Sequence, residues 1–122
     1  DIIDIRRIKK TIDKYNLRFK KRCFHPGEIY KSEKRLKSEE SYAKRYAAKE
    51  ACAKALGTGL ARGVFWKDIE VQNDKFGKPY YLINSKIKHL IRRKKKIKNF
   101  NLFLSISDEK EYSVAFTIIQ KI

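Results

Sequence analysis

An alanine-rich stretch at residues 42–59 constrains the fold of this chain more than any other part of the sequence. It reads YAKRYAAKEACAKALGTG, and alanine is the strongest helix former. Gly57 directly follows the last apolar residue of the stretch, at the position where a left-handed helix cap belongs. Ala43, Ala47 and Ala51 recur at a spacing of four, so they share one helix face. The stretch therefore predicts a long helix with a small-residue face that another backbone can approach closely.

A single carboxylate, Glu50, lies in this stretch among lysines and arginines. It can form an ion pair with Lys54 one turn later, a contact that contributes about 0.3 kcal/mol. It can also ligate a metal ion that faces a phosphate group. Both interpretations are open at this point, and the choice depends on what the rest of the chain brings to the same place.

The chain is short and strongly basic. We expect a single domain over residues 1–122 with one modest core. The formal net charge is +17, and such a surface attracts polyanions: nucleic acid, anionic membrane, phosphorylated cofactors or acidic proteins. An AT-rich coding bias can also raise the lysine, isoleucine and asparagine content together without any selection for binding.

The cysteines and the apolar runs bear on the compartment. Cys23 and Cys52 show no metal-binding spacing, and this usage favours a reduced, cytoplasmic protein over a secreted one. The sequence has no run of about eighteen apolar residues, so we expect no transmembrane helix and no membrane partner.

Periodicity along the chain predicts an α+β fold. Apolar residues at helical spacing indicate helices, and alternation of apolar and polar residues indicates strands. The expected helices are 6–15, 17–24, 26–36, 42–56 and 85–96, and the expected strands are 1–5, 65–73, 80–83, 102–107 and 112–119. We therefore expect a small antiparallel sheet packed against the long Ala-rich helix and the shorter helices.

The first strand carries an acid on its apolar face. Alternation places Asp1 on the same side as Ile3 and Ile5, and a buried carboxylate needs a partner because an unpaired buried charge is costly. Composition alone favours a local lysine or arginine as that partner. The alternative is that Asp1 and Glu50 converge on a divalent cation, since Mg²⁺ is usually held by one or two carboxylates together with substrate phosphates.

Three further features have a structural explanation at least as good as a functional one. Residues 57–59 read Gly-Thr-Gly, but they follow a helix rather than precede one, which is the wrong end for a helix-dipole phosphate site. The five cations at 92–96 are typical of a solvated helix end, and nucleic-acid binding is the functional rival. His25 and His89 have no nucleophile near them in sequence, so we expect neither to be catalytic.

Four stretches resemble the holo-acyl-carrier-protein synthases, which are small 4'-phosphopantetheinyl transferases. They are DIIDIRRI at 1–8, RYAAKEACAKALGTG at 45–59, IEVQND through GKP at 69–79, and SISDEKEY at 105–112. Their order and spacing agree with the family over essentially the whole chain. Four independent matches in one short chain are more specific than any single motif.

The resemblance implies an activity and its residues. The family transfers the phosphopantetheine arm of coenzyme A to a serine of apo-acyl carrier protein, a step of fatty acid biosynthesis, and releases adenosine 3',5'-bisphosphate. Asp1 and Glu50 match the family's ligands for Mg²⁺, and Lys54 matches a lysine near the pyrophosphate, so these three are the expected catalytic residues. The base that takes the serine proton is left open between Glu50 and a metal-bound water.

The resemblance also implies binding surfaces and an assembly. The positions that match the lining of the coenzyme A cleft are Arg45, Lys49, Lys54, Gly57, Thr58, Gly59, Lys78 and Pro79. Arg7 matches an arginine on the helix with which the family binds its acidic carrier protein, and Arg18 and Arg22 follow on the next basic turn. The family is typically a homotrimer with its sites between subunits. The competing hypotheses are a basic nucleic-acid-binding module without catalysis and a transferase-like domain that has lost activity.

Overall fold

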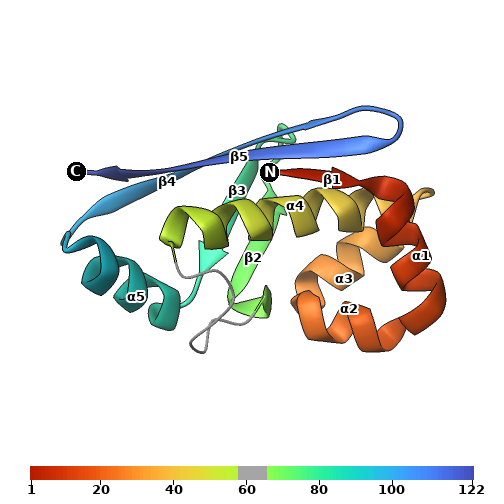
Figure 1. The fold of residues 1–122 in the computed structure, drawn as a ribbon, viewed down its shortest axis with the longest axis horizontal. Coiled ribbons are helices and arrows are strands. Elements are labelled where there is room, and N and C mark those ends of the chain that lie inside the picture. Colours follow the sequence, from red (N-terminus) through yellow and green to blue (C-terminus); the bar gives the residue numbers. More distant parts are fainter. Residues whose placement is uncertain (58–65) are drawn as a thin grey trace.

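Helix α4 (Ser38–Leu56) runs through the middle of the molecule, and the other elements lie around it (Figure 1). The computed structural model describes residues 1–57 and 66–122. In chain order the other elements are β1 (Ile2–Asp4), α1 (Ile5–Tyr15), α2 (Leu17–Cys23), α3 (Pro26–Glu33), the short 3-10 helix η1 (Trp66–Asp68), β2 (Ile69–Asn73), β3 (Pro79–Ile83), α5 (Ser85–Lys95), β4 (Phe100–Asp108) and β5 (Tyr112–Lys121). The predicted α+β fold, with a small antiparallel sheet on a long Ala-rich helix, is confirmed.

Helix α4 has the predicted cap and the predicted small-residue face. It ends at Gly57, whose φ of 80° is left-handed and whose N–H donates to the carbonyls of Ala53 and Lys54. It begins at Ser38, earlier than predicted, because Glu39 and Glu40 occupy the first turn, where acidic side chains complement the positive end of the helix. Residues 38–41, which lie between the predicted helices 26–36 and 42–56, therefore form the first turn of α4.

The sheet β1-β5-β4 is antiparallel and covers one side of α4. Ile3 pairs with Ser113 and Ile2 with Val114, so the buried and exposed residues alternate along β1 and β5 as the sequence predicts. Ala115 is fully buried in the inner face, and its small side chain lets the alanine face of α4 approach the sheet. This contact is what brings the start of β1 next to the second half of α4.

The hairpin β2–β3 packs against α4 from another direction. The hydroxyl of Tyr81 in β3 donates to the carbonyl oxygen of Ala48 at 2.7 Å and lies 2.6 Å from the hydroxyl of Thr117 in β5. One side chain thus ties the hairpin to both the helix and the sheet. The strand predicted over 65–73 is wrong at its start, since Trp66–Asp68 form a 3-10 turn that aims the carbonyls of Trp66 and Ile69 at one lysine of α4.

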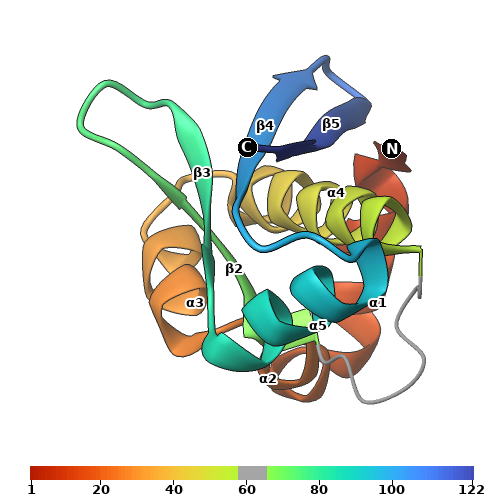
Figure 2. The same cartoon turned by 90° about the vertical axis from the view of Figure 1, so that its left-hand side faces the viewer.

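The remaining helices lie on the side of α4 opposite the sheet. Figure 2 shows α4 between β4–β5 on one side and α2, α3 and α5 on the other. Helices α1 to α3 gather at the N-terminal end of α4, and α5 lies at its C-terminal end (Figure 1). Within residues 1–57 and 66–122, no helix has the length and apolar character needed to span a membrane.

Candidate active site

Asp1 lies at the edge of the sheet, where β1 meets α4. The N–H of Ala115 donates to its carbonyl oxygen at 2.7 Å, and the terminal amino group of Asp1 donates back to the carbonyl of Ala115. The side chain is only 11% exposed, and its Oδ1 accepts a hydrogen bond from Lys54 Nζ at 2.7 Å. Its Oδ2 is buried and has no hydrogen-bond partner in the part of the chain that the structure describes.

Glu50 lies on α4 one turn before Lys54 and is half-buried. Neither a hydrogen bond nor an ion pair involves its carboxylate among residues 1–57 and 66–122. The interpretation of Glu50 and Lys54 as an i,i+4 ion pair is therefore wrong, because Lys54 binds Asp1 instead. The carboxylate of Glu50 keeps its full capacity to bind a cation or a proton.

Charges from two helices meet near Glu50. Burial raises the pKa of the Tyr46 hydroxyl, the negative charge of Glu50 raises it further, and the positive charge of Arg7 lowers it. Arg7 lies on α1, which packs against α4 beside β1. Arg7, one of the residues predicted to bind the carrier protein, and Glu50 therefore both act on the Tyr46 hydroxyl.

The residues at this place fit a divalent cation. A buried carboxylate oxygen without a donor is costly, and a cation bound to Asp1 Oδ2 would remove that cost. No group of three or more His, Cys, Asp or Glu side chains in the described ranges could hold a metal. A cation here would therefore bind two protein carboxylates. Mg²⁺ is usually bound by one or two carboxylates, and waters and substrate phosphates complete its coordination.

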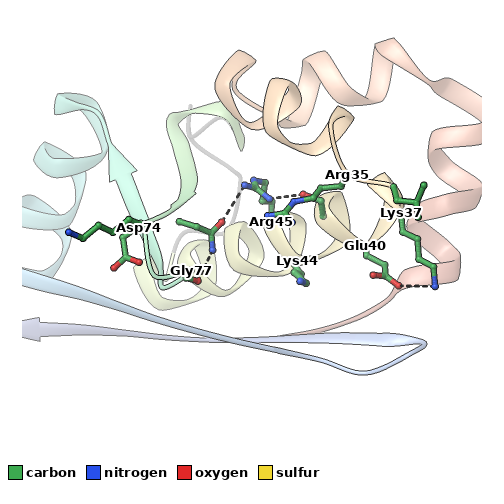
Figure 3. Close-up of a pocket in the computed structure, with 11 residues that line it drawn as sticks. Arg35, Lys37, Glu40, Lys44, Arg45, Asp74 and Gly77 are labelled. Carbon is green, nitrogen blue, oxygen red and sulfur yellow. Dashed lines mark hydrogen bonds and ion pairs between the residues drawn. The ribbon is translucent and has the colours of Figure 1, made fainter.

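A basic pocket lies on the N-terminal half of α4, between the α3–α4 connection and the β2–β3 turn (Figure 3). Its volume is about 650 Å³. Five cations and two carboxylates line it, together with small or neutral residues; the charged ones are Arg35, Lys37, Lys44, Arg45, Lys75, Glu40 and Asp74. The excess of positive charge suits a ligand with several phosphate charges.

Arg45 forms the floor of this pocket. It is 7% exposed, its Nη1 donates to Ser41 Oγ at 2.7 Å, and its Nη2 lies 3.5 Å from Asn73 Oδ1. Its Nε is buried without a hydrogen-bond partner in the described part of the chain. Burial lowers the pKa of Arg45, while the charge of Glu28 works in the opposite direction. Figure 3 shows Arg45 between Arg35 and the hairpin, so its guanidinium is held in place before any ligand arrives.

Lys49 does not reach a pocket. Its side chain is fully buried, and its ammonium donates to Glu28 Oε1 at 2.6 Å, to the carbonyl of Trp66 at 2.9 Å and to the carbonyl of Ile69 at 2.5 Å. An ammonium has three N–H donors, so this arrangement leaves none for a ligand. Burial lowers the pKa of Lys49, and Glu28 offsets that effect. The structure places Lys49 in the core as the anchor of η1 and β2.

The remaining predicted cleft residues lie in two turns. Gly57 caps α4, whereas Thr58 and Gly59 lie outside the described residues. Lys78 and Pro79 follow the β2–β3 turn, and the side chain of Asp74 fixes that turn by accepting from the N–H of Lys78 at 2.9 Å. The turn contributes other residues to the basic pocket, and Lys78 adds one more exposed cation next to it.

The arginines predicted to bind a carrier protein are all exposed. Arg7 lies on α1, and Arg18 and Arg22 lie on α2, which follows α1 directly. Helices α1 and α2 together form one end of the molecule (Figure 1). The structure joins Lys54 to Asp1, and Glu50 lies one turn before Lys54 on α4.

Comparison with known proteins identifies the family of this chain. The sequence profile of the 4'-phosphopantetheinyl transferase superfamily matches residues 1–117. The chain belongs to this superfamily. It is similar to the holo-[acyl-carrier-protein] synthase of Pelagibacter ubique (strain HTCC1062), with 48% identity over 121 residues that cover 99% of this chain and 93% of that relative.

Solved structures of the superfamily have the same fold. The holo-[acyl-carrier-protein] synthase from Neisseria meningitidis superposes with a TM-score of 0.87 at 32% identity, covering 99% of this chain and 94% of that one. The holo-(acyl-carrier-protein) synthase from Bacillus anthracis str. Ames, solved in complex with CoA (3',5'-ADP), superposes with a TM-score of 0.79 at 35% identity, covering 100% and 93%. Both similarities extend over almost the whole of α4 and the sheet that surround the candidate site.

Two features of the site were missed from the sequence. The first is the role of Glu28, which caps α3 together with His25 and also accepts from Lys49 and from the N–H of Val71. The second is the pocket around Arg45. One signal was present for the first: Lys49 is followed at three and four residues by Cys52 and Ala53, so it lies on an apolar helix face where a lysine needs a buried acid.

Proposed function

We propose that this chain is a holo-acyl-carrier-protein synthase, which transfers the 4'-phosphopantetheine arm of coenzyme A to a serine of apo-acyl carrier protein and releases adenosine 3',5'-bisphosphate. The observation that carries the proposal is the Asp1 carboxylate, half satisfied by Lys54 and half unsatisfied, next to the unpartnered carboxylate of Glu50. Membership of the superfamily and 48% identity to a curated holo-[acyl-carrier-protein] synthase support it. The relative solved with CoA (3',5'-ADP) supports coenzyme A as the donor.

Asp1 and Glu50 hold Mg²⁺ in this proposal. When bound, Mg²⁺ supplies positive charge that neutralises the pyrophosphate of coenzyme A. The serine oxygen forms a bond to the phosphorus that carries the pantetheine, and the bond from that phosphorus to the bridging pyrophosphate oxygen breaks. The electron pair leaves with adenosine 3',5'-bisphosphate, and positioning and charge neutralisation supply most of the catalysis in such phosphoryl transfers.

In this proposal Lys54 contacts the phosphate charge, and Glu50 accepts the proton of the serine hydroxyl. The ammonium of Lys54 is 68% exposed at its side chain, and it can contact a phosphate oxygen without leaving Asp1 because it has further N–H donors. The proton of the serine hydroxyl passes to Glu50, since the carboxylate of Glu50 has no donor partner within residues 1–57 and 66–122.

The pocket around Arg45 binds the nucleotide end of coenzyme A. Its cations converge on one hollow, and Ser41 and Asn73 hold the guanidinium of Arg45 there before a ligand binds. Lys78 and Pro79 border this pocket, and Gly57 with Thr58 and Gly59 remain proposed contacts for the rest of the coenzyme. Lys49 stabilises the cleft from inside the core rather than touching the ligand.

The end of the molecule formed by α1 and α2 binds the carrier protein. Arg7, Arg18 and Arg22 are exposed there, and Arg7 acts on the same tyrosine as Glu50. An acidic acceptor is attracted to such a surface, and the attraction raises the association rate in a salt-dependent way.

The outer face of the sheet β1-β5-β4 is an interface between copies of the chain in a homotrimer. Its exposed large apolar residues are adjacent across the strands; they are Ile2, Phe103, Tyr112, Val114, Phe116 and Ile118. A contiguous apolar surface of this kind is unusual on a chain that stays monomeric, and a closed homo-oligomer buries it against identical surfaces. Phe116→Glu is expected to give monomers in analytical ultracentrifugation, whereas Phe76→Glu on the β2–β3 turn leaves the trimer intact; monomeric wild-type protein would contradict this assembly.

The cysteines support a reducing compartment. Cys23 and Cys52 are both free and buried, and unpaired thiols of this kind are typical of a cytoplasmic protein.

The activity is tested by the mass of the carrier protein. Incubation of apo-acyl carrier protein with coenzyme A, Mg²⁺ and this chain is expected to add the mass of one phosphopantetheine group. Glu50→Gln is expected to lower kcat/KM by about 10²- to 10³-fold, and Glu39→Gln, a matched change in the first turn of α4, leaves it unchanged. Full activity of Glu50→Gln would eliminate Glu50 as ligand and base.

A further inference from the structure

Helix α5 and the turn after it carry a group of cations that the proposed active site does not use. We call Lys88, Arg93, Lys94, Lys95, Lys96 and Lys98 the α5 basic cluster, and all six are exposed. The sequence has no aspartate or glutamate between Asp74 and Asp108, so the cluster has no acidic neighbour along the chain. In residues 1–57 and 66–122, none of the six lies within ion-pair distance of a carboxylate.

The cluster is not explained by the stability of the helix. Cations in the last turn complement the helix dipole, but Lys88 lies in the middle of α5 and Lys98 lies beyond its end. Lys88 and Arg92 are four residues apart, and like charges at that spacing destabilise a helix. Arg92 differs from the cluster, since its Nε donates to the carbonyl of Lys98 at 2.9 Å and its guanidinium lies over the ring of Phe100.

The residue that caps α5 is a second reason to assign a function to the cluster. Lys96 closes the helix in the left-handed conformation, with φ 54° and ψ 44°. Glycine or asparagine adopts this conformation more readily than lysine does. The chain therefore keeps a cation at a position where its backbone favours another residue, and a strained conformation of that kind suggests a use for the side chain.

The cluster borders the proposed active site. Lys94 packs at the end of α4, where a Cβ placed on Gly57 would lie 3.7 Å from its Cε. Gly57 is one turn beyond Lys54, which holds Asp1. Figure 1 shows α5 at this end of α4, whereas α1 and α2 occupy the other end. A protein that presents its serine to Asp1 and Glu50 from the α1–α2 end therefore has a second basic surface within reach.

We propose that the α5 basic cluster is a second docking surface for the carrier protein, and that it binds a carboxylate-rich part of that partner distinct from the part bound at Arg7, Arg18 and Arg22. The inference rests on the proposed function, because only a protein substrate has to be held beside Asp1 and Glu50. A protein partner is favoured over nucleic acid because the cluster lies at the reactive end of α4. Two separated basic surfaces fix the orientation of an acidic partner, which one surface alone leaves free to rotate.

The test compares two triple variants with the same loss of charge. Arg93→Gln/Lys95→Gln/Lys96→Gln removes the outer part of the cluster, and Lys31→Gln/Lys110→Gln/Lys121→Gln removes three exposed lysines elsewhere. We expect the first triple to raise KM for apo-acyl carrier protein and its Kd by calorimetry by about tenfold at about 0.15 M salt, because several exposed ion pairs are lost together. The second triple is expected to change both by less than twofold, and kcat and KM for coenzyme A stay constant in both.

Each alternative outcome overturns the inference. Equal effects of the two triples would mean that only the net charge matters. A rise in KM for coenzyme A alone would assign the cluster to the coenzyme. Unchanged carrier binding together with loss of binding to a labelled single-stranded RNA would make the cluster a nucleic-acid surface.

Two further measurements test whether charge is the cause of the effect and whether carrier binding is distinct from transfer. The conservative variant Arg93→Lys/Lys95→Arg keeps the charge and is expected to bind the carrier like wild type; loss of binding there would contradict a charge-based surface. Calorimetry needs no turnover, so wild-type protein that binds the carrier through the cluster but transfers nothing would refute the proposed function and leave this inference standing.

Discussion

Two lysine–carboxylate pairs lie along α4, and they differ in how completely their atoms are bonded. Lys49 and Glu28 are both fully buried and 2.6 Å apart, and Lys54 and Asp1 are 2.7 Å apart with the lysine largely exposed. In the first pair the ammonium has three acceptors and both carboxylate oxygens have donors. In the second pair one carboxylate oxygen is buried without a partner in the described residues.

The contrast separates a structural pair from a functional one. Their distances are nearly equal, so distance does not distinguish them. A buried pair with every donor and acceptor used fixes the backbone around it and has nothing left to offer a ligand. The pair at Asp1 retains an oxygen, and Glu50 beside it retains two, so this region can take a cation. Lys49 and Lys54, five residues apart on one helix, therefore have different roles.

The largest effect is expected from breaking the satisfied pair. Lys49→Met leaves Glu28 charged and buried without its main partner, and loss of one member of a buried pair costs about 3–5 kcal/mol of unfolding free energy. Chemical denaturation followed by circular dichroism measures it.

Two controls sharpen that measurement. Lys54→Met is expected to cost less than Lys49→Met, because the lysine of this pair is largely exposed and solvent screens its charge. The double variant Lys49→Met/Glu28→Gln is expected to recover part of the loss. Equal destabilisation by the changes at Lys49 and Lys54 would remove the distinction between the two pairs.

A smaller effect on stability and a large one on activity are expected from the unsatisfied pair. Asp1→Asn changes the unfolding free energy by less than about 1 kcal/mol, since it removes an ion pair whose lysine is largely exposed and also removes a charge from a nearly buried position. It lowers kcat/KM for phosphopantetheine transfer by about 10²-fold or more, because the proposed cation loses a charged ligand. The Mg²⁺ concentration that gives half-maximal rate should rise in the same assay.

Asp13→Asn on α1 is the matched control, because its carboxylate is exposed and lies away from β1. An Asp1→Asn protein that is as active as wild type at every Mg²⁺ concentration would show that the free oxygen of Asp1 has no catalytic use.

The sequence predicted the elements better than the bonds between them. The alanine periodicity, the Gly57 cap and the face shared by Asp1 and Ile3 are local properties, and each is confirmed. The start of α4 was misplaced because acidic residues at the start of a helix resemble a polar connection. The strand before Ile69 was misplaced because the 3-10 turn is held by Lys49, which is distant in sequence.

The partners of the charged side chains could not be predicted in the same way. Periodicity indicates which face a residue occupies, but not which distant element supplies its partner. Lys54 was expected to bind Glu50 at i,i+4 or a phosphate, and it binds Asp1, which is fifty-three residues away in sequence. Resemblance to the family brought Asp1 and Glu50 to one site, and that site assignment stays a prediction until Asp1→Asn and Glu50→Gln are assayed.

The smallest expected effect concerns a third carboxylate, Glu33. Both of its oxygens have hydrogen-bond donors, as in Glu28, but it lies near the surface. The hydroxyl of Tyr42 donates to Glu33 Oε2 at 2.7 Å, and Lys20 Nζ donates to both oxygens at 3.1 Å. The hydrogen bond from Tyr42, followed by the contact with Lys20, holds the pKa of Glu33 below its ordinary value of 4.5. The unfolded chain therefore binds more protons than the folded chain between those two values.

Glu33 thus contributes stability that is present above about pH 4.5 and is lost as the pH falls through its lowered folded pKa. Glu33→Gln should be less stable than wild type at pH 7, and the two urea midpoints should converge towards pH 3. Glu109→Gln, a change in the exposed β4–β5 turn, should keep the difference from wild type constant over the same range. Parallel pH profiles for wild type and Glu33→Gln would show that hydrogen bonds to a carboxylate at this depth leave its titration unaffected, and the distinction between satisfied and unsatisfied acids would then hold only in the core.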